Sequence, residues 1–274
     1  MKKISRRSFM AAAAVSVAAL AMTACGGSAS SAASSVASSA ASSEAVSSAA
    51  AELTTVETGK LTMATNATFP PYEMTTDSGE LEGIDVDTAK AIAEKLGLEL
   101  QIDDMDFDAA LLSVQQGKAD IVMAGVTVTD ERKAVMDFSD SYATGIQSII
   151  VPEGSDITSP DDLAGKKIGT QRGTTGYIYC SDDFGDDAVV AYDDGLTAVQ
   201  ALNNGQVDAV VIDNAPAKEF VAANPGLVIL DTSYAEEDYA IGLAKGSALE
   251  DAVNAALEEL KADGTLQSIV DKYI

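Results

Sequence analysis

From residue 53 to the end of the chain, short apolar runs alternate with amphipathic segments, and this alternation constrains the fold more than any other feature. Apolar runs such as "KLTMATN" predict buried strands. Residues 85–97, "DVDTAKAIAEKLG", carry apolar residues at helical spacing and end on a glycine, which commonly terminates a helix. Strands that alternate with helices are typical of α/β proteins, so we expect an α/β fold.

One short pattern occurs twice along the chain. Residues 111–125 and residues 199–213 each contain the end of a helix, a glycine, polar residues, an aspartate and a buried strand. We expect single strands at 121–129, "IVMAGVTVT", and at 238–247, "DYAIGLAKGS". The repetition indicates that the two halves of the chain are built in the same way.

Each half is long enough for a modest sheet of its own, and we therefore expect two lobes, each a small, mostly parallel sheet flanked by helices. The first predicted lobe comprises residues 53–146 and 235–274, and the second comprises residues 147–234. This division requires the chain to cross between the lobes twice, which makes a hinge. In such folds a ligand binds at the carboxyl ends of strands, facing the cleft.

The first 52 residues have the features of an export signal followed by a flexible linker. Residues 1–24 have a basic start and a short apolar run, which is typical of an export signal peptide. "MTAC" resembles the bacterial lipoprotein box, in which Cys25 receives a lipid and becomes the new N-terminus; the alternative is ordinary secretion with cleavage nearby. Residues 25–52 are nearly all Ser, Ala and Gly and predict a flexible spacer. "SRRSFM" resembles a twin-arginine signal, and the choice between that route and general secretion stays open.

Composition excludes several kinds of function. The chain has no histidine, so a Ser-His-Asp triad, a histidine-bound zinc and an imidazole base are impossible. A net charge of -26 argues against nucleic acid as a partner. The acidic runs lack the spacing of a calcium-binding loop, and we expect no metal or cofactor. Cys180 is expected to be a small buried residue without a redox role.

The segment "AGVTVTDERKAVMDFSDSY", residues 124–142, resembles the polar amino acid family of extracellular solute-binding proteins, the receptors that supply ABC importers. "TNATFPPYEM", "EGIDVD", "GTTG" and "DAVVIDNAP" extend the resemblance over residues 53–274. The resemblance implies a two-lobe periplasmic-binding-protein-like fold of type II and no enzymatic activity. It also implies a free L-amino acid as ligand, an ABC permease as partner, a monomer, and a lipid-anchored location on the extracytoplasmic face of the cell membrane.

The carboxylate of an amino acid needs a cation and directed hydrogen bonds when it leaves water. Arg132 can offer a planar, bidentate pair of donors. The backbone NH groups of Thr127, Thr174 and Thr175 are expected to complete the set. Without the motif, an arginine in "TDER" would be a surface residue, and this remains the alternative.

The ammonium group of an amino acid needs an acid and neutral acceptors. Asp213, at the end of "DAVVID", is the expected counter-charge, with the carbonyl of Gly125 and the hydroxyl of Thr127 as further acceptors. The alternative for Asp213 is a helix cap for "NAPAKEF".

For the ligand side chain, the resemblance implies that Phe69 and Phe107 form walls on its two sides, with Tyr72 packed beneath the first. Both phenylalanines could instead be ordinary core residues. Proline stiffening in "FPPY" would hold such a wall in place.

The specificity of the expected site rests on two amides. Basic-amino-acid receptors of this family often carry an acid where this chain has Asn66. Asn66 with Gln171 would make a neutral polar cavity, which suits glutamine or another uncharged polar amino acid. Arg172 is expected at the rim; if it points inward, glutamate or aspartate would be preferred.

Two other functions share this scaffold. One is a ligand-sensing module for a membrane signalling partner. The other is a cyclohexadienyl-dehydratase-like enzyme, for which Asn66 or Glu73 would be the nearest general acid. No catalytic dyad is apparent in the sequence.

Overall fold

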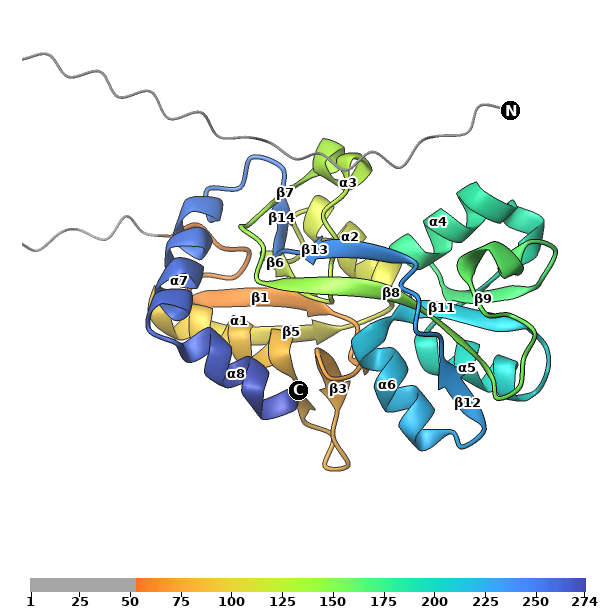
Figure 1. Ribbon diagram of the computed structural model, residues 1–274. Helices are drawn as coiled ribbons and strands as arrows, with labels where there is room; N and C mark the ends of the chain where they lie inside the picture. The colour runs from red at the N-terminus through yellow and green to blue at the C-terminus, as the bar shows by residue number, and fades with distance from the viewer. Residues whose placement is uncertain (1–52) are drawn as a thin grey trace, which may run out of the picture. The chain divides into compact units, whose positions relative to one another are not determined.

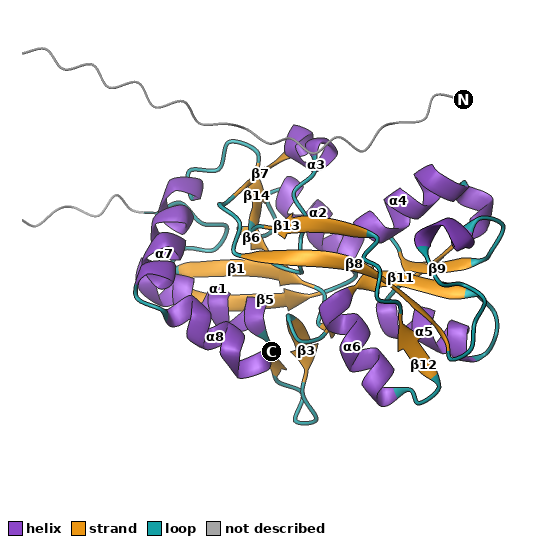
Figure 2. Cartoon of the chain, viewed as in Figure 1, coloured by secondary structure: helices purple, strands orange, loops and turns teal. Residues whose placement is uncertain are grey.

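The computed structural model describes residues 53–274 and contains two larger sheets and one small one (Figure 1). The predicted signal peptide, Cys25 and the predicted spacer lie outside the described residues. Figure 2 shows that the helices lie around the sheets. Within residues 53–274, no helix combines the length and the apolar character needed to cross a bilayer.

The first sheet has the strand order β5-β1-β6-β14-β7. β5, β1 and β6 are parallel, whereas β14 is antiparallel to β6 and to β7. The sheet is therefore mixed but mostly parallel, as expected: only β14, which returns from the second half of the chain, runs opposite to the other four strands. The strands are β1 (Lys60–Thr65), β5 (Glu99–Asp104), β6 (Ile121–Val122), β7 (Met136–Phe138) and β14 (Gly242–Ala244).

Helices cover both faces of this first sheet. On one face, Leu61 and Met63 of β1 belong to a core shared with α1, α7 and α8. On the other face, Ala64 packs in a core with α2. The predicted helix at 85–97 is confirmed as α1, which ends at Gly97 in the left-handed conformation. The helices are α1 (Ile84–Leu96), α2 (Phe107–Gln115), α7 (Glu250–Ala262) and α8 (Thr265–Tyr273), with the short α3 (Asp130–Val135) between β6 and β7.

The second sheet has the order β10-β9-β11-β8-β12, and β13 also pairs with β8. β10, β9 and β11 are parallel, but β8 is antiparallel to β11, β12 and β13, so this sheet is mixed as well. The long β8 enters from the first half of the chain and therefore opposes the local strands. The strands are β8 (Ala143–Pro152), β9 (Ile168–Gln171), β10 (Val189–Tyr192), β11 (Ala209–Asp213), β12 (Leu227–Ile229) and β13 (Ala235–Tyr239).

Three helices cover the second sheet. Cys180 of α4 packs with Ile149 and Val211 on one face, whereas α5 and α6 share a core with Ile150 and Val210 on the other. The helices are α4 (Thr175–Phe184), α5 (Gly195–Asn203) and α6 (Asn214–Ala223), with single 3₁₀ turns η1 (Pro160–Leu163) and η2 (Asp186–Ala188).

The chain passes between the two sheets twice, as expected. The first passage leads from β7 to β8 and the second from β13 to β14, and β8 and β13 pair along residues 143–147 and 235–239. The single strand expected at 238–247 is wrong. Tyr239 pairs with the second sheet, whereas Gly242 pairs with Val122 in the first, so the run is divided between the sheets.

The strand expected at 121–129 is also shorter than predicted, because β6 ends at Val122. The chain turns at Gly125, whose φ is 55° and whose backbone NH donates to the Asp85 carboxylate over 2.9 Å. This turn directs the following residues toward the second sheet, where an isolated bridge joins Thr127 to Tyr239.

A small sheet, β2-β3-β4, follows β1 and is made of Thr68–Phe69, Glu73–Thr75 and Leu81–Glu82. Its first two strands pair Phe69 with Glu73. Phe69 and Glu73 are both buried, which places them on the inner side of the molecule.

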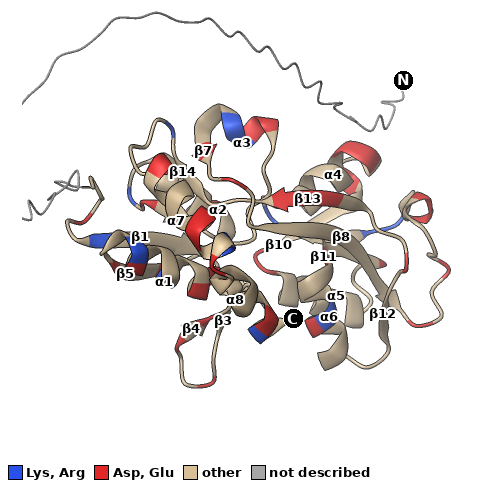
Figure 3. Ribbon diagram, turned by 60° about the vertical axis from the view of Figure 1, so that its left-hand side comes forward, with Lys and Arg blue, Asp and Glu red and all other residues tan. Residues whose placement is uncertain are grey.

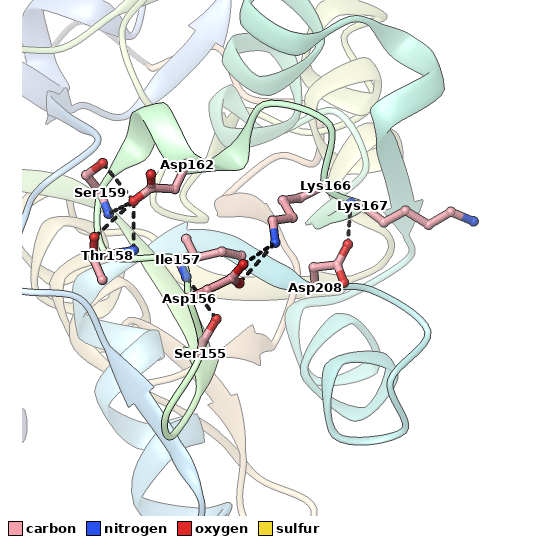
Figure 4. A network of polar contacts seen from close by, with 9 residues as sticks. All are labelled: Ser155, Asp156, Ile157, Thr158, Ser159, Asp162, Lys166, Lys167 and Asp208. Atoms are coloured by element: carbon pink, nitrogen blue, oxygen red, sulfur yellow. Dashed lines mark hydrogen bonds and ion pairs between the residues drawn. The ribbon is translucent and has the colours of Figure 1, made fainter.

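A polar network secures the loop between β8 and β9 (Figure 4). One carboxylate oxygen of Asp162 accepts hydrogen bonds from the backbone NH groups and hydroxyls of Thr158 and Ser159, each at 3.0 Å. Lys166 pairs with Asp156 at 3.0 Å. The network satisfies loop donors at the start of η1 and gives no indication of a ligand site.

Gly83 provides a test of this packing. Its φ is +136°, and a Cβ there would lie 2.1 Å from the Tyr72 carbonyl oxygen. Strained backbone and overpacking each cost about 1–3 kcal/mol, so we expect Gly83→Ala to lower the free energy of unfolding by about 2–6 kcal/mol.

The control is Gly79→Ala. Gly79 also has a positive φ, +84°, but a Cβ there would meet nothing within 4 Å. We expect a loss of about 1–2 kcal/mol from backbone strain alone. Equal losses in urea denaturation of the two variants would contradict the predicted close approach at Gly83.

Candidate functional site

A narrow cavity lies where strands of both sheets end. It receives residues that follow β1, β5 and β6 in the first sheet, and residues at the ends of β9 and β11 in the second. All ten positions predicted to bind ligand line this cavity, joined by two that were not predicted to do so, Glu73 and Ala124. The lining residues are Asn66, Phe69, Glu73, Phe107, Ala124, Gly125, Thr127, Arg132, Gln171, Thr174, Thr175 and Asp213.

The cavity is tight in this conformation. About 20 Å³ is available to the centre of a water-sized sphere, which is enough for water and far too little for an amino acid. A ligand of that size requires the facing side chains to move apart.

Arg132 is a buried cation in the cavity wall, only 8% exposed. It lies in α3, where Thr129 caps the helix by accepting from the Arg132 backbone NH over 3.2 Å. Its guanidinium donates to the carbonyl of Thr127 at 2.8 Å and to the carbonyl of Gly173 at 3.1 Å, and lies 5.5 Å from the centre of the Phe107 ring. Arg132 therefore joins the segment after β6 to the segment after β9.

The amino end of α4 faces the same part of the cavity. Thr174 caps α4 by accepting from the Tyr177 backbone NH, and Thr175 is the first helical residue. Free backbone NH groups at a helix start attract anions, and Arg132 adds a full positive charge beside them. This side of the cavity is the positive pole.

Asp213 forms the opposite, negative pole. It ends β11 and is 7% exposed. The hydroxyl of Tyr239 and the side-chain amide of Gln147 donate to its two oxygens. Burial raises the pKa of Asp213 to about 7, although both hydrogen bonds favour the charged form.

Glu237 is a further acid behind the cavity, on β13. One of its oxygens accepts hydrogen bonds from the Thr127 hydroxyl at 3.2 Å, the Thr175 hydroxyl at 3.0 Å and the Gln147 amide at 3.0 Å. Burial lowers the pKa of Arg132, and the charge of Glu237 is the largest effect that opposes this lowering. Glu237 therefore links residues of both halves of the cavity wall.

Two amides face each other across the cavity. The side-chain NH₂ of Gln171 donates to the Asn66 side-chain oxygen at 2.8 Å, and the Asn66 amide donates to the carbonyl of Met105 at 2.9 Å. This pair joins the segment after β1 to the end of β9. The two amides largely satisfy one another, so they offer fewer free donors and acceptors than the sequence suggested.

Aromatic rings close the remaining sides. Phe69 and Phe107 are 7% and 6% exposed and both line the cavity. Tyr72 stacks on Phe69 with ring centres 5.9 Å apart, and meets Tyr239 edge-on at 5.3 Å. Tyr72 thus lies beneath the Phe69 wall.

Glu73 differs from every other polar residue of the cavity. It is fully buried, and no NH or hydroxyl group donates to either carboxyl oxygen; its one hydrogen-bond neighbour is the Asp85 carboxyl, a contact that requires one of the two acids to hold a proton. Burial raises the pKa of Glu73 well above its usual value, and the nearby Asp85 carboxylate raises it further. Asp85 is itself fully buried, accepts from the Gly125 NH and the Tyr142 hydroxyl, and has a pKa raised by burial to about 6.

Sequence reasoning named Glu73 only as a possible catalytic acid and did not single out Glu237. In "PPYEM" the position of Glu73 next to two prolines gives no signal of burial. Glu237 lies among three consecutive acids, "EED", a pattern typical of a solvent-exposed face.

Arg172 and Cys180 lie outside the cavity. The Arg172 side chain is 55% exposed and lies 3.6 Å from Asp193. Cys180 is buried and unpaired, and burial raises the pKa of its thiol to about 12. In the described part of the chain, no cluster of acids or cysteines has the geometry of a metal site.

The fold and the cavity define a class of protein. Two mixed sheets joined by two crossings are the architecture of the type II periplasmic binding proteins, and here a buried cation and a buried acid both line the cavity where strands of the two sheets end. A model of the bacterial extracellular solute-binding proteins, family 3, matches residues 61–274, and the chain belongs to that family.

Relatives and solved structures agree with this assignment. The L-cystine-binding protein TcyJ of Escherichia coli K12 is 34% identical over 222 residues, which cover 79% of this chain and 83% of that protein. The glutamine-binding protein GlnH of Bacillus subtilis is 35% identical and covers 72% of this chain and 74% of its own length. An ancestral arginine-binding protein, solved with glutamine and also with arginine, superposes with a TM-score of 0.75 at 44% identity, covering 79% of this chain and 98% of its own.

The buried acids predict an unusual pH dependence of stability. Because the pKa values of Asp213 and Asp85 are raised to about 7 and about 6, the native state keeps protons that the unfolded state has already lost. Stability of the ligand-free protein should therefore fall between about pH 4 and pH 7, by up to about 1.4 kcal/mol per pH unit for each group.

Urea denaturation at several pH values measures this slope. Asp213→Asn should make it shallower. The control, Asp263→Asn, removes an exposed acid whose pKa is lowered to about 2, so its effect should be lost only below about pH 4. Stability that rises from pH 4 to pH 7 would contradict the account.

Proposed function

We propose that this protein captures a free L-amino acid outside the cytoplasm and delivers it to an ABC importer. The observation that carries the proposal is the pairing of Arg132 and Asp213 as opposite poles of one cavity. A free amino acid always carries one carboxylate and one ammonium, and each requires a counter-charge when it leaves water. The names of the relatives, which bind cystine, arginine or glutamine, support the same function.

The α-carboxylate would bind at the positive pole. Arg132 would turn its donors from the Thr127 and Gly173 carbonyls to the ligand, together with the NH groups at the start of α4. The α-ammonium would pair with Asp213 and with the neutral oxygens of Gly125 and Thr127. Glu237 is a poorer candidate for this role, because it does not line the cavity and already accepts from three donors.

Capture would depend on closure of two lobes, residues 53–146 with 235–274, and residues 147–234. The poles come from different lobes, so a bound amino acid would hold them together. The paired segments of β8 and β13 would act as the hinge.

For the ligand side chain, we propose a cationic or amide-bearing group. The sequence favoured glutamine because Asn66 replaces an acid. Glu73 supplies a carboxyl that has no partner in the cavity wall, whereas Asn66 and Gln171 already bond to each other. A guanidinium or ammonium would pair with Glu73, and an aliphatic side chain would leave it unsatisfied. Phe69 and Phe107 would lie along the apolar part of the side chain.

We also propose that Cys25 carries a lipid that anchors the protein on the extracytoplasmic face of the membrane, with residues 25–52 as the spacer and residues 1–24 as the signal. The proposal rests on the order of basic start, apolar run, "MTAC" and Ser/Ala-rich segment. We propose that the protein acts as a monomer without enzymatic activity. Recovery of the ligand chemically unchanged after long incubation would distinguish it from the dehydratase alternative, and interaction with a membrane kinase would favour the sensing alternative.

Isothermal calorimetry on pole variants tests the binding proposal. We expect Arg132→Ala and Asp213→Ala each to weaken binding of the best amino acid by tens to thousands of times. Removing one partner of a buried charge pair costs about 2–5 kcal/mol. The control is Arg172→Ala, which removes an exposed arginine beside the cavity and should leave affinity within about twofold. Near-native affinity in either pole variant, with a native circular dichroism spectrum, would show that the head group binds elsewhere.

Fractionation of cells tests the lipid anchor. The variant Cys25→Ser should appear in the medium or remain unprocessed, because no other residue can receive the lipid. Cys180→Ser is the matched control and should stay with the membrane, since Cys180 is buried between α4 and the second sheet. Fully processed Cys25→Ser protein that remains membrane-bound would refute the anchor.

A further inference from the structure

The cavity is surrounded by more negative than positive groups. Glu73, Asp85, Asp213 and Glu237 are all at most 7% exposed, whereas Arg132 is the one cationic side chain of residues 53–274 that is buried to a similar degree. Burying a carboxylate without a cation costs free energy. Some of these acids must therefore be protonated or accept hydrogen bonds from neutral donors.

Most of these acids have partners. Asp213 accepts from Tyr239 and Gln147, Glu237 accepts from three donors, and Asp85 accepts from Gly125 and Tyr142. The exception is Glu73, whose two oxygens accept from nothing.

No positive group faces Glu73. From β3 it is influenced by Asp85 on α1, by Asp213 at the end of β11 and by Asp104 at the end of β5, all of which are acids. The adjacent phenol of Tyr72 is neutral at physiological pH. Every neighbouring element therefore favours the protonated form of Glu73.

We propose that Glu73 holds a proton in the ligand-free protein, releases it to solvent when a cationic side chain enters the cavity, and keeps it when a neutral amide side chain enters. The inference rests on the proposed function, and it adds a mechanism by which one cavity accepts two classes of amino acid. The pKa of Glu73 is raised in the direction that this requires.

The two cases differ in hydrogen bonding and charge. A guanidinium beside Glu73 supplies the missing positive charge and favours the carboxylate, so the proton leaves. A primary amide presents a carbonyl oxygen, to which a protonated Glu73 donates. In both cases the carboxyl gains a partner from the ligand, whereas in the ligand-free cavity its one hydrogen-bond neighbour is the acid Asp85.

Asp213 and Asp85 also titrate, and the test must separate them from Glu73. The ligand ammonium, which every amino acid carries, would drive any proton from Asp213. That release is shared by all amino acids, whereas Asp85 is hydrogen-bonded to Glu73 and titrates together with it. The proton of Glu73 is therefore measured as the difference between two ligands.

The experiment is isothermal calorimetry on the purified full-length chain with L-arginine and L-glutamine at pH 7, in phosphate and in Tris. The dependence of the observed enthalpy on the buffer gives the number of protons released. We expect arginine to release about one more proton than glutamine. The ratio of arginine to glutamine affinity should accordingly rise about tenfold per pH unit between pH 5 and pH 7.

Variants identify the group. Glu73→Gln should abolish the difference in proton release and lower the ratio of arginine to glutamine affinity at least tenfold. Glu80→Gln, an exposed acid in the same small sheet region, is the matched control and should preserve both. A circular dichroism melt confirms that both variants fold.

The outcomes separate the two proposals. Equal proton release by both ligands in the wild-type protein, or binding of glutamine but not arginine, would overturn the inference and leave the proposed function intact. A difference that persists in Glu73→Gln would also overturn it. Binding of no amino acid by the folded wild-type protein would overturn the proposed function and the inference together.

Discussion

The buried guanidinium of Arg132 is the interaction on which the rest of the cavity depends. It lies between the carbonyls of Thr127 and Gly173, which belong to segments leaving different sheets. Its charge is offset by Glu237, which also accepts hydrogen bonds from the hydroxyls of Thr127 and Thr175. Arg132 therefore connects segments of both sheets at the wall of the cavity.

The excess of acid around that cation explains the chemistry of the cavity. The protein as a whole is strongly acidic, and Figure 3 shows Asp and Glu on many helices and strands. Surface acids are solvated at little cost, but Glu73, Asp85 and Asp213 are buried, so burial sets their pKa values. A ligand that brings positive charge therefore satisfies groups that the protein alone leaves protonated.

Much of the architecture could be predicted from the sequence because local signals agreed with the fold. The glycine stop of α1 is a local feature, and the structure confirms it. Most of the predicted site residues meet in one cavity because they lie at or soon after the ends of β1, β5, β6, β9 and β11, and the parallel strands of a sheet end at the same edge. Their role in ligand binding stays a prediction.

The errors arose where non-local pairing decided the structure. The run at 238–247 looks like one strand, but its halves pair with different sheets, which depends on the partners and not on the run itself. Glu73 could not be assigned because its burial is imposed by the small sheet after β1 and by Asp85, which is 12 residues away in the chain and adjacent in the cavity.

A crystal structure with L-arginine bound tests the central claim most directly, because it shows which pole receives which end of the ligand. The account predicts that the α-carboxylate bonds to Arg132 and the start of α4, the α-ammonium lies against Asp213, and the guanidinium of the ligand lies against Glu73. A ligand bound in the reverse direction, or at a site that does not touch Arg132, would contradict it.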